Sequence, residues 1–154
     1  MDKTNVMRIL DNLNIKYNYY NYDNSETRGE EVAKLVGKDA NMVFKTLVTI
    51  GSDNKHYVFM IPVNCELDLK KAALCANVKR IEMIKQKELF PLTGYIHGGC
   101  SPIGMKKDFP TFIDEVALLF DEICFSGGKV GYQVEVGIED LKKLFGDCFS
   151  DLTK

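Results

Sequence analysis

The sequence predicts a single α+β domain over residues 1–154, a mixed, mostly antiparallel curved sheet or barrel with helices flanking it. The length of 154 residues and the hydrophobic share of 45% suffice for one sizeable core and are small for two. β-prone runs bounded by turn signals alternate with amphipathic helical stretches. No repeat, linker or low-complexity segment interrupts them, so all elements are expected to share one core.

The N-terminal elements follow from periodicity and turn chemistry. Apolar residues within 6–13 recur with helical spacing, and the tyrosine-rich run 17–22 is typical of a strand. Thr27 and Glu30 have the spacing of a capping box. A second helix is therefore expected to begin there and to end near Gly37, which can take the left-handed conformation of a helix end.

The middle of the chain predicts a hairpin followed by short elements. The segment 46–63, TLVTIGSDNKHYVFMIPV, contains two β-prone runs around a Gly-Ser-Asp-Asn turn. Residues 68–76 have a helical apolar face, and 79–83 form a short β-prone run. Residues 85–90 predict one or two further helical turns that end at Pro91, because proline cannot continue the helical hydrogen bonds.

The C-terminal part begins with a long loop and returns to strands. After the loop 94–110, we expect strands at 111–114, 122–125 and 132–136, the last with period-two alternation. Residues 138–145 have the apolar spacing of a closing helix.

Composition restricts the class of protein. No run approaches the roughly 20 apolar residues of a membrane helix, and the five cysteines are widely spaced with no CxxC pair. We therefore expect a cytoplasmic protein with reduced thiols and without a membrane segment, metal or cofactor. Because the net charge is −2, contact with nucleic acid must come from a local basic patch.

Two glycine loops, 98–104 and 126–131, are candidate oxygen-binding sites. Glycine allows successive N–H groups to converge on an anionic or carbonyl oxygen, although a pair of tight turns is the alternative reading. Gly99 and Gly104 have the spacing of a nucleotide P-loop, but Met105-Lys106 stands where Lys-Ser/Thr is required. A nucleotide-binding P-loop is therefore excluded.

Several reactive side chains have no supporting motif. Lys45 stands within an apolar run and either extends to solvent or points into a polar cleft. Cys100 is not part of any nucleophile signature, and His56 and His97 are isolated. The lysine pairs 70–71, 106–107 and 142–143 are typical of solvated faces, although the pair beside the glycine loop could contact phosphates.

Three segments together resemble the YbaK/EbsC family, namely VFKTLV, GYIHGGCSPIGMKKDFPTFIDE and SGGKVG. These are stand-alone editing domains related to the insertion domain of bacterial prolyl-tRNA synthetases, and PVNCELDLKKAA resembles the Cys-tRNA(Pro)/Cys-tRNA(Cys) deacylase branch. The resemblance implies the editing-domain fold and hydrolysis of mischarged aminoacyl-tRNA, above all Cys-tRNA(Pro), with the substrate thiol attacking its own ester. An editor of Ala-tRNA that uses a bound water, and a non-catalytic aminoacyl- or RNA-binding module, are the alternatives.

The resemblance also implies the site residues and partners. Lys45, Gly98 and Gly99 inherit catalytic roles, whereas Cys100 and His97 are expected to be bystanders. Arg28 stands where relatives have a phenylalanine and Gln133 where they have an aspartate. Mischarged tRNA is the expected substrate, and a prolyl- or cysteinyl-tRNA synthetase the expected partner. The expected substrate-binding residues are Tyr22, Arg28, Thr46, Ser101, Ser126, Gly127 and Gln133.

Overall fold

The computed structural model describes residues 2–23 and 27–154. Its helices are α1 (Asn5–Asn12), α2 (Gly29–Val36), η1 (Ala40–Met42), α3 (Leu69–Ala76), α4 (Gln86–Thr93), η2 (Glu115–Leu119) and α5 (Ile138–Phe145), where η denotes a 3₁₀ helix. Its strands are β1 (Tyr17–Asn21), β2 (Phe44–Gly51), β3 (His56–Pro62), β4 (Ile81–Met83), β5 (Thr111–Asp114), β6 (Glu122–Ser126), β7 (Tyr132–Gly137) and β8 (Phe149–Ser150). The predicted α+β class is confirmed.

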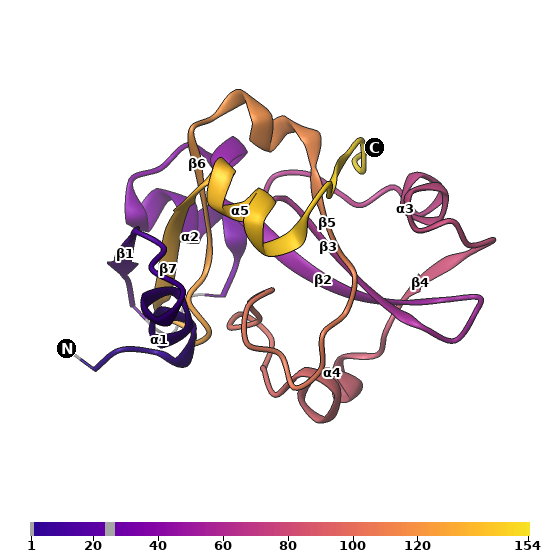
Figure 1. The fold of residues 1–154 in the computed structure, drawn as a ribbon, viewed down its shortest axis with the longest axis horizontal. Coiled ribbons are helices and arrows are strands. Elements are labelled where there is room, and N and C mark those ends of the chain that lie inside the picture. Colours follow the sequence, from indigo (N-terminus) through magenta and orange to yellow (C-terminus); the bar gives the residue numbers. More distant parts are fainter. Residues whose placement is uncertain (1, 24–26) are drawn as a thin grey trace.

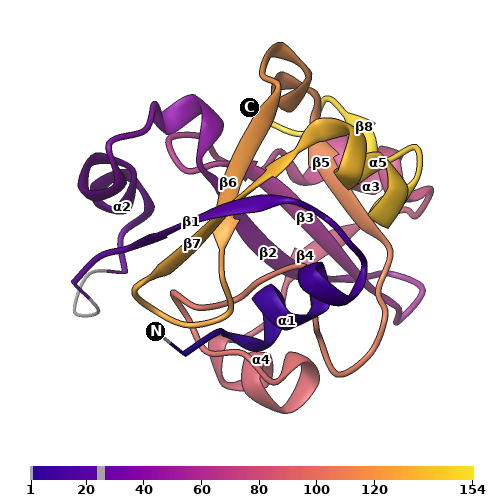
Figure 2. The same cartoon turned by 60° about the vertical axis from the view of Figure 1, so that its left-hand side comes forward.

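The strands form two sheets that meet at one point. The smaller sheet has the order β1-β7-β6 and is antiparallel throughout. The larger sheet has the order β4-β2-β3-β5-β8, in which β5 and β8 run parallel to β3. A parallel bridge between Val43 and Cys124 connects the two sheets, and in Figure 2 the small sheet crosses in front of β2 and β3. The mixed sheet is therefore confirmed, whereas the alternative of a closed barrel is wrong.

The main core lies between the two sheets and is closed by the first and last helices. The apolar face of α1 provides Val6, Met7 and Leu10, none of which has exposed surface. These side chains pack with residues of β6, β7 and α5 in one cluster. A second cluster lies on the other side of the large sheet, beneath α3. Burial on both faces explains why β3 is apolar along nearly its whole length.

Two predicted helix boundaries are wrong. The second helix begins at Gly29 with Arg28 as its cap residue, and the capping box from Thr27 to Glu30 is not formed. A Cβ at position 29 would lie 2.6 Å from a methyl carbon of Val63, so the first residue of this helix packs closely against the residue that follows β3. Further along the chain, α4 continues past Pro91.

The helix α4 continues to Thr93 because packing and a side-chain bond stabilise its last turn. Leu89 and Leu92 of α4 pack in a cluster with Val48 and Val58. The hydroxyl of Thr93 donates to the carbonyl oxygen of Leu89 at 2.7 Å, which satisfies a group near the helix end. Tertiary contacts here outweigh the local preference of proline.

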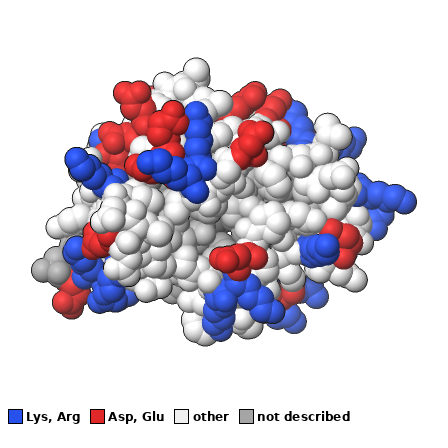
Figure 3. Space-filling view, viewed as in Figure 1, with Lys and Arg blue, Asp and Glu red and all other residues white. Residues whose placement is uncertain are grey.

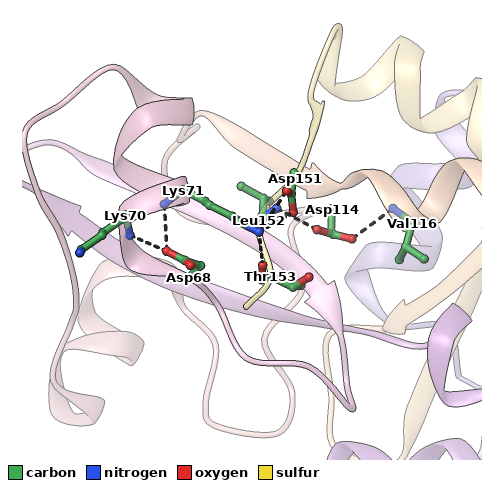
Figure 4. Close-up of polar contacts among 8 residues, drawn as sticks. All are labelled: Asp68, Lys70, Lys71, Asp114, Val116, Asp151, Leu152 and Thr153. Atoms are coloured by element: carbon green, nitrogen blue, oxygen red, sulfur yellow. Dashed lines mark hydrogen bonds and ion pairs between the residues drawn. The ribbon is translucent and has the colours of Figure 1, made fainter.

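The C-terminal segment is fastened to the large sheet by polar contacts that the sequence did not predict (Figure 4). Asp114, at the end of β5, is almost fully buried and accepts from the N–H of Val116 and from the N–H of Leu152 at 2.9 Å. Lys71 of α3 donates to the carbonyl oxygen of Thr153 and pairs with Asp151 at 3.0 Å. These contacts hold the segment after α5 beside β5, where it adds the two-residue strand β8.

Candidate active site

A cavity of about 310 Å³ lies between α2, the free edge of β2, the loop after α4, and the hairpin of β6 and β7. Its volume falls at the lower end of the range for small-molecule sites. The predicted site residues that line it are Tyr22, Arg28, Lys45, Thr46, Gly98, Ser126 and Gln133. Segments far apart in the sequence thus converge on one cavity.

Three predicted site residues lie outside the cavity lining. The N–H of Gly99 donates to the carbonyl oxygen of Ile96 at 3.0 Å and is not free to bind a ligand. Ser101 has no exposed surface, and its hydroxyl oxygen accepts from the N–H of Ile103. The N–H of Gly127 donates to Tyr132 across the β6–β7 hairpin at 2.9 Å. These residues shape the two glycine loops and do not face the cavity.

His97 and Cys100, which were expected to be bystanders, both lie on the cavity wall. Burial raises the pKa of the Cys100 thiol to about 12, so the thiol is protonated at neutral pH. A protonated thiol is a poor nucleophile. The position of Cys100 therefore suits contact with a ligand better than attack on one.

The two glycine loops pack directly against each other. A Cβ at Gly99 would lie 3.0 Å from the backbone nitrogen of Val130, which leaves no space for a side chain between the loops. Gly98 has a φ of +85°, in the left-handed region that favours glycine. Within the described residues, the N–H of Gly98 has no hydrogen-bond partner. Loop packing thus presents the free N–H of Gly98 beside the cavity.

The register of β2 leaves part of its edge open at the cavity. Val63 donates to the carbonyl oxygen of Val43, and Gly51 donates to that of Lys55. Because antiparallel ladders alternate with period two, odd-numbered residues of β2 bond to β3 and the main chain of Thr46 faces away from it. On that side β4 pairs with 49–51, beyond Thr46. The cavity wraps around this free edge, so side chains on both faces of β2 reach it.

Two buried polar atoms of the cavity have no partner among the described residues. They are the hydroxyl oxygen of Thr46 and the side-chain oxygen of Gln133. Gln133 is only 6% exposed, and buried polar atoms are rarely left unbonded. A ligand with hydrogen-bond donors would satisfy both atoms, which the sequence alone did not reveal.

The cavity lining carries positive charge. Lys45 and Arg28 belong to it, whereas none of the lining residues that the structure describes is an aspartate or glutamate. Across the described ranges, Lys45 forms no ion pair or hydrogen bond with another side chain. A cavity with cationic groups and no carboxylate favours ligands with oxygen acceptors or negative charge.

A buried ionic network beside the cavity was missed by sequence reasoning. Glu135 is 2% exposed and accepts from Asn18 at 2.9 Å and from Tyr20 at 3.0 Å, while Lys38 pairs with its other oxygen at 3.0 Å. Burial alone would raise the pKa of Glu135, but the bonds from Asn18, Lys38 and Tyr20 lower it below its ordinary value. The signal in the sequence is a carboxylate within an otherwise apolar alternating strand.

The same network anchors the helix that forms one wall of the cavity. Lys38 follows α2 directly, and its ammonium group also lies 5.1 Å from the centre of the Tyr20 ring. Hydrogen bonds to Tyr20 and Glu135 raise the pKa of Lys38 above its ordinary value. Because Gln133 and Glu135 are two residues apart on β7, they point to the same face of the sheet. The pair thus ties α2 to the strand that carries Gln133.

The sequence matches a known family over most of its length. The family model described as the aminoacyl-tRNA editing domain matches residues 24–144. The chain belongs to the aminoacyl-tRNA editing domain family. The resemblance expected from the glycine loops and the VFKTLV segment is therefore confirmed.

Individual relatives of this editing domain agree with that placement. A protein of Enterococcus faecalis, provisionally named Cys-tRNA(Pro)/Cys-tRNA(Cys) deacylase EbsC, is 43% identical over 153 residues, which cover 98% of this chain and 93% of the relative. A proline–tRNA ligase of Shouchella clausii is 30% identical over 109 residues, which cover 70% of this chain and 19% of the ligase. The editing domain thus resembles a stand-alone protein along its whole length and the ligase along one part.

Solved structures share the fold. One, described as a candidate trans-editing enzyme for prolyl tRNA synthetase, superposes with a TM-score of 0.84 at 24% identity and covers 100% of this chain and 99% of its own. The hypothetical protein APE2540 superposes with a TM-score of 0.88 at 19% identity, covering 97% of this chain and 99% of its own. At these identities the two structures establish the fold of the editing domain alone.

The described part of the editing domain has neither a membrane-spanning helix nor a cluster of metal-ligating side chains. None of its helices is both long and apolar enough to cross a bilayer. Among the same residues, no group of three or more histidine, cysteine, aspartate or glutamate side chains is placed to hold a metal ion.

Proposed function

We propose that this chain is a trans-editing deacylase that hydrolyses the ester of mischarged aminoacyl-tRNA, with Cys-tRNA(Pro) as its principal substrate. Membership of the aminoacyl-tRNA editing domain family and 43% identity to a protein named as a Cys-tRNA deacylase support this proposal. The observation that carries it is the cavity, which combines an unpaired lysine, a free glycine N–H and two unbonded buried oxygens. Such a set of donors and acceptors suits an aminoacyl ester.

In the proposed reaction, the substrate supplies the nucleophile. The thiol sulfur of the cysteinyl group attacks its own ester carbonyl carbon, a C–S bond forms, and the C–O bond to the terminal ribose breaks. The thiol proton passes to the ribose oxygen, so the tRNA leaves with its hydroxyl restored and the cysteine leaves as a cyclic thiolactone. Attack within one molecule is efficient because correct alignment contributes about 7–11 kcal/mol.

The side chains at the cavity support a substrate nucleophile over a protein one. The protonated thiol of Cys100 is unsuited to attack, as its pKa of about 12 indicates. The hydroxyl oxygen of Ser126 accepts from the N–H of Gly128 at 3.1 Å within a turn, and no histidine bonds to it among the described residues. A serine without a neighbouring base is not activated.

The protein's role is then to bind, align and stabilise. The N–H of Gly98 would donate to the carbonyl oxygen as negative charge develops on it. Lys45 would orient the terminal ribose or the same carbonyl. The side-chain oxygens of Thr46 and Gln133, which have no partner among the described residues, would accept hydrogen bonds from the α-amino group. Ser126 would also help to bind this group.

Recognition of the tRNA body is proposed to depend on a synthetase. The net charge of −2 gives no long-range attraction to RNA, and a segment of a proline–tRNA ligase is similar to this chain. A prolyl- or cysteinyl-tRNA synthetase that holds the tRNA would supply the missing selectivity. Added synthetase should then raise the discrimination between tRNA bodies.

Substitution of Lys45 tests the proposal directly. In Lys45→Met, kcat/KM for deacylation of Cys-tRNA(Pro) should fall at least about a hundredfold, the typical loss when one transition-state donor is removed. The matched control is Lys55→Met, at the exposed turn of the same hairpin, which should keep the wild-type rate. Equal rates for Lys45→Met and the wild type would refute the assignment.

A further inference from the structure

We propose that α4 and the turn following the glycine loop form a binding surface for the single-stranded 3′ end of tRNA. The surface consists of Phe90, Ile96, Lys106 and Lys107, and we call it the α4 surface. The inference rests on the proposed function, since it concerns the nucleotides next to the ester that enters the cavity.

Two members of the α4 surface are adjacent in sequence to residues that line the cavity. Leu89 lines the cavity, and the adjacent Phe90 is 55% exposed. Ile96 is 58% exposed, and the adjacent His97 lines the cavity. Two large apolar side chains thus lie in solvent immediately beside lining residues. A molecule that enters the cavity with a further chain attached must cross the adjoining surface.

Lys106 is held over Phe90 by its surroundings. Its ammonium group lies 5.2 Å from the centre of the Phe90 ring and donates to the carbonyl oxygen of Pro91 at 3.5 Å. Its stem passes close to Gly94, where an added Cβ would lie 3.4 Å from the Lys106 Cγ. The exposed part of the Phe90 ring offers apolar area to a base, and the neighbouring ammonium group offers a contact to a phosphate.

The charge around α4 suits the binding of a polyanion, although the net charge of the whole chain does not. Residues 85–108 contain four lysines and two acidic residues, in a chain of net charge −2. Figure 3 shows blue side chains gathered at the lower edge of this face, in the area that α4 occupies in Figure 1, with acidic groups beside them. This is the local basic patch that RNA contact by this chain would require.

Single-stranded RNA is the occupant that these features favour. Single strands bind where aromatic side chains stack on bases and cations follow the phosphates. Ile96 is a second exposed apolar side chain next in sequence to a lining residue, and Lys107, also exposed, follows Lys106 in the sequence. A protein partner would not require a cation next to the Phe90 ring. The experiment below distinguishes a protein partner from RNA.

The test measures binding of a short fluorescent RNA that ends in CCA, together with deacylation of Cys-tRNA(Pro). Phe90→Ala should weaken RNA binding at least about fivefold, the loss expected for one stacked base. The double variant Lys106→Ala/Lys107→Ala should make the slope of log Kd against log salt shallower by about 1.4, since two phosphate contacts on a single strand are lost. For both variants, kcat/KM should fall more on Cys-tRNA(Pro) than on cysteinyl-adenosine, which lacks the preceding nucleotides.

The matched control is the double variant Lys142→Ala/Lys143→Ala on α5. These consecutive lysines pair with Glu139 at 3.2 Å and Asp140 at 3.8 Å, and they should affect neither RNA affinity nor its salt dependence. If the α4 variants keep the wild-type RNA affinity and salt slope, the α4 surface does not bind RNA, and the proposal is overturned. A protein partner for this surface would give the same result. RNA binding that the α4 variants weaken, in a protein that shows no deacylation, would support the surface while contradicting the proposed function.

Discussion

Gly98 occupies a backbone conformation and a neighbourhood that suit no larger residue. Its φ is +85°, and an added Cβ would lie 2.8 Å from the Cγ2 of Thr27 and 3.3 Å from a methyl group of Val130. Gly37 shares the left-handed conformation, with a φ of +72°, but has nothing within 4 Å of an added Cβ. A substitution at Gly37 would therefore cause backbone strain alone, whereas one at Gly98 would cause the same strain and also disturb the cavity wall.

Replacement of these glycines by alanine should give different effects on activity. Both Gly98→Ala and Gly37→Ala should lower the free energy of unfolding by about 1–2 kcal/mol, because alanine resists the left-handed region. Only Gly98→Ala should also lower kcat/KM for deacylation, by tenfold or more, because its methyl group pushes apart the loops beside the free N–H. Urea unfolding and steady-state kinetics measure the two effects. Equal activity of the two variants would argue against a role of the Gly98 N–H.

At this scale, the sequence predicted residue types better than their orientations. The glycine pattern located both loops, yet Gly99 and Gly127 bond to neighbouring residues, and of these three glycines Gly98 alone lines the cavity without a bonded N–H among the described residues. Which way an N–H points depends on local φ and on the packing of one loop against the other. The spacing of glycines in the sequence reveals neither of these. The orientation of the buried Ser101 side chain could not be predicted from the sequence either.

At the scale of elements, α2 depends on a small number of contacts. In Figure 2 it stands at one side of the molecule, away from the main core between the sheets. Ala33 packs in a separate small cluster with Val43, Val63 and Cys124. The ion pair between Lys38 and Glu135 is therefore an important contact between α2, which forms this wall of the cavity, and β7.

Removal of the Lys38 ammonium group should destabilise the protein. Lys38→Met should lower the free energy of unfolding by roughly 3 kcal/mol, because it leaves the buried Glu135 carboxylate without its countercharge. The control Lys34→Met removes an exposed pair with Glu31 on α2 and should cost no more than about 0.5 kcal/mol. Urea unfolding of both variants at neutral pH measures the difference. Similar values for the two would show that the network contributes little.

The pH dependence of this contribution follows from the two pKa shifts. The pKa of Glu135 is lowered on folding, so its contribution is full above the ordinary glutamate value of 4.5 and is lost as the pH falls through the lowered value. The pKa of Lys38 is raised, so its contribution is full below 10.5 and is lost as the pH rises through the raised value. The difference between Lys38→Met and the wild type should thus be constant near neutral pH and shrink in acid, where the unpaired Glu135 carboxyl of the variant takes up a proton.

For the whole molecule, the sequence predicted the elements better than their assembly. The hairpin of β2 and β3, the strands after the long loop and the closing helix lie where periodicity placed them. The arrangement of two sheets joined by a single bridge between Val43 and Cys124 was not predictable, because strand pairing depends on residues far apart in the sequence. Likewise β8 has only two residues, and contacts of Asp114 and Lys71 hold the segment that contains it. Such features depend on contacts between residues distant in sequence.

For the whole molecule, the central chemical proposal is that the substrate's thiol is the nucleophile. The cavity then serves to align and stabilise, and its own thiol at Cys100 takes no part in bond formation. This claim separates a cysteine editor from an alanine editor with a bound water, since alanine has no group that could attack the ester.

The most direct measurement compares deacylation of Cys-tRNA(Pro) with that of Ser-tRNA(Pro) and Ala-tRNA(Pro) by the purified protein. Serine and alanine are no larger than cysteine, so exclusion by size cannot protect their esters. The account predicts rapid release of tRNA from the cysteinyl ester, with thiolactone or its hydrolysis product cysteine, and at least about a hundredfold slower release from the other two. Comparable rates for all three esters would contradict it.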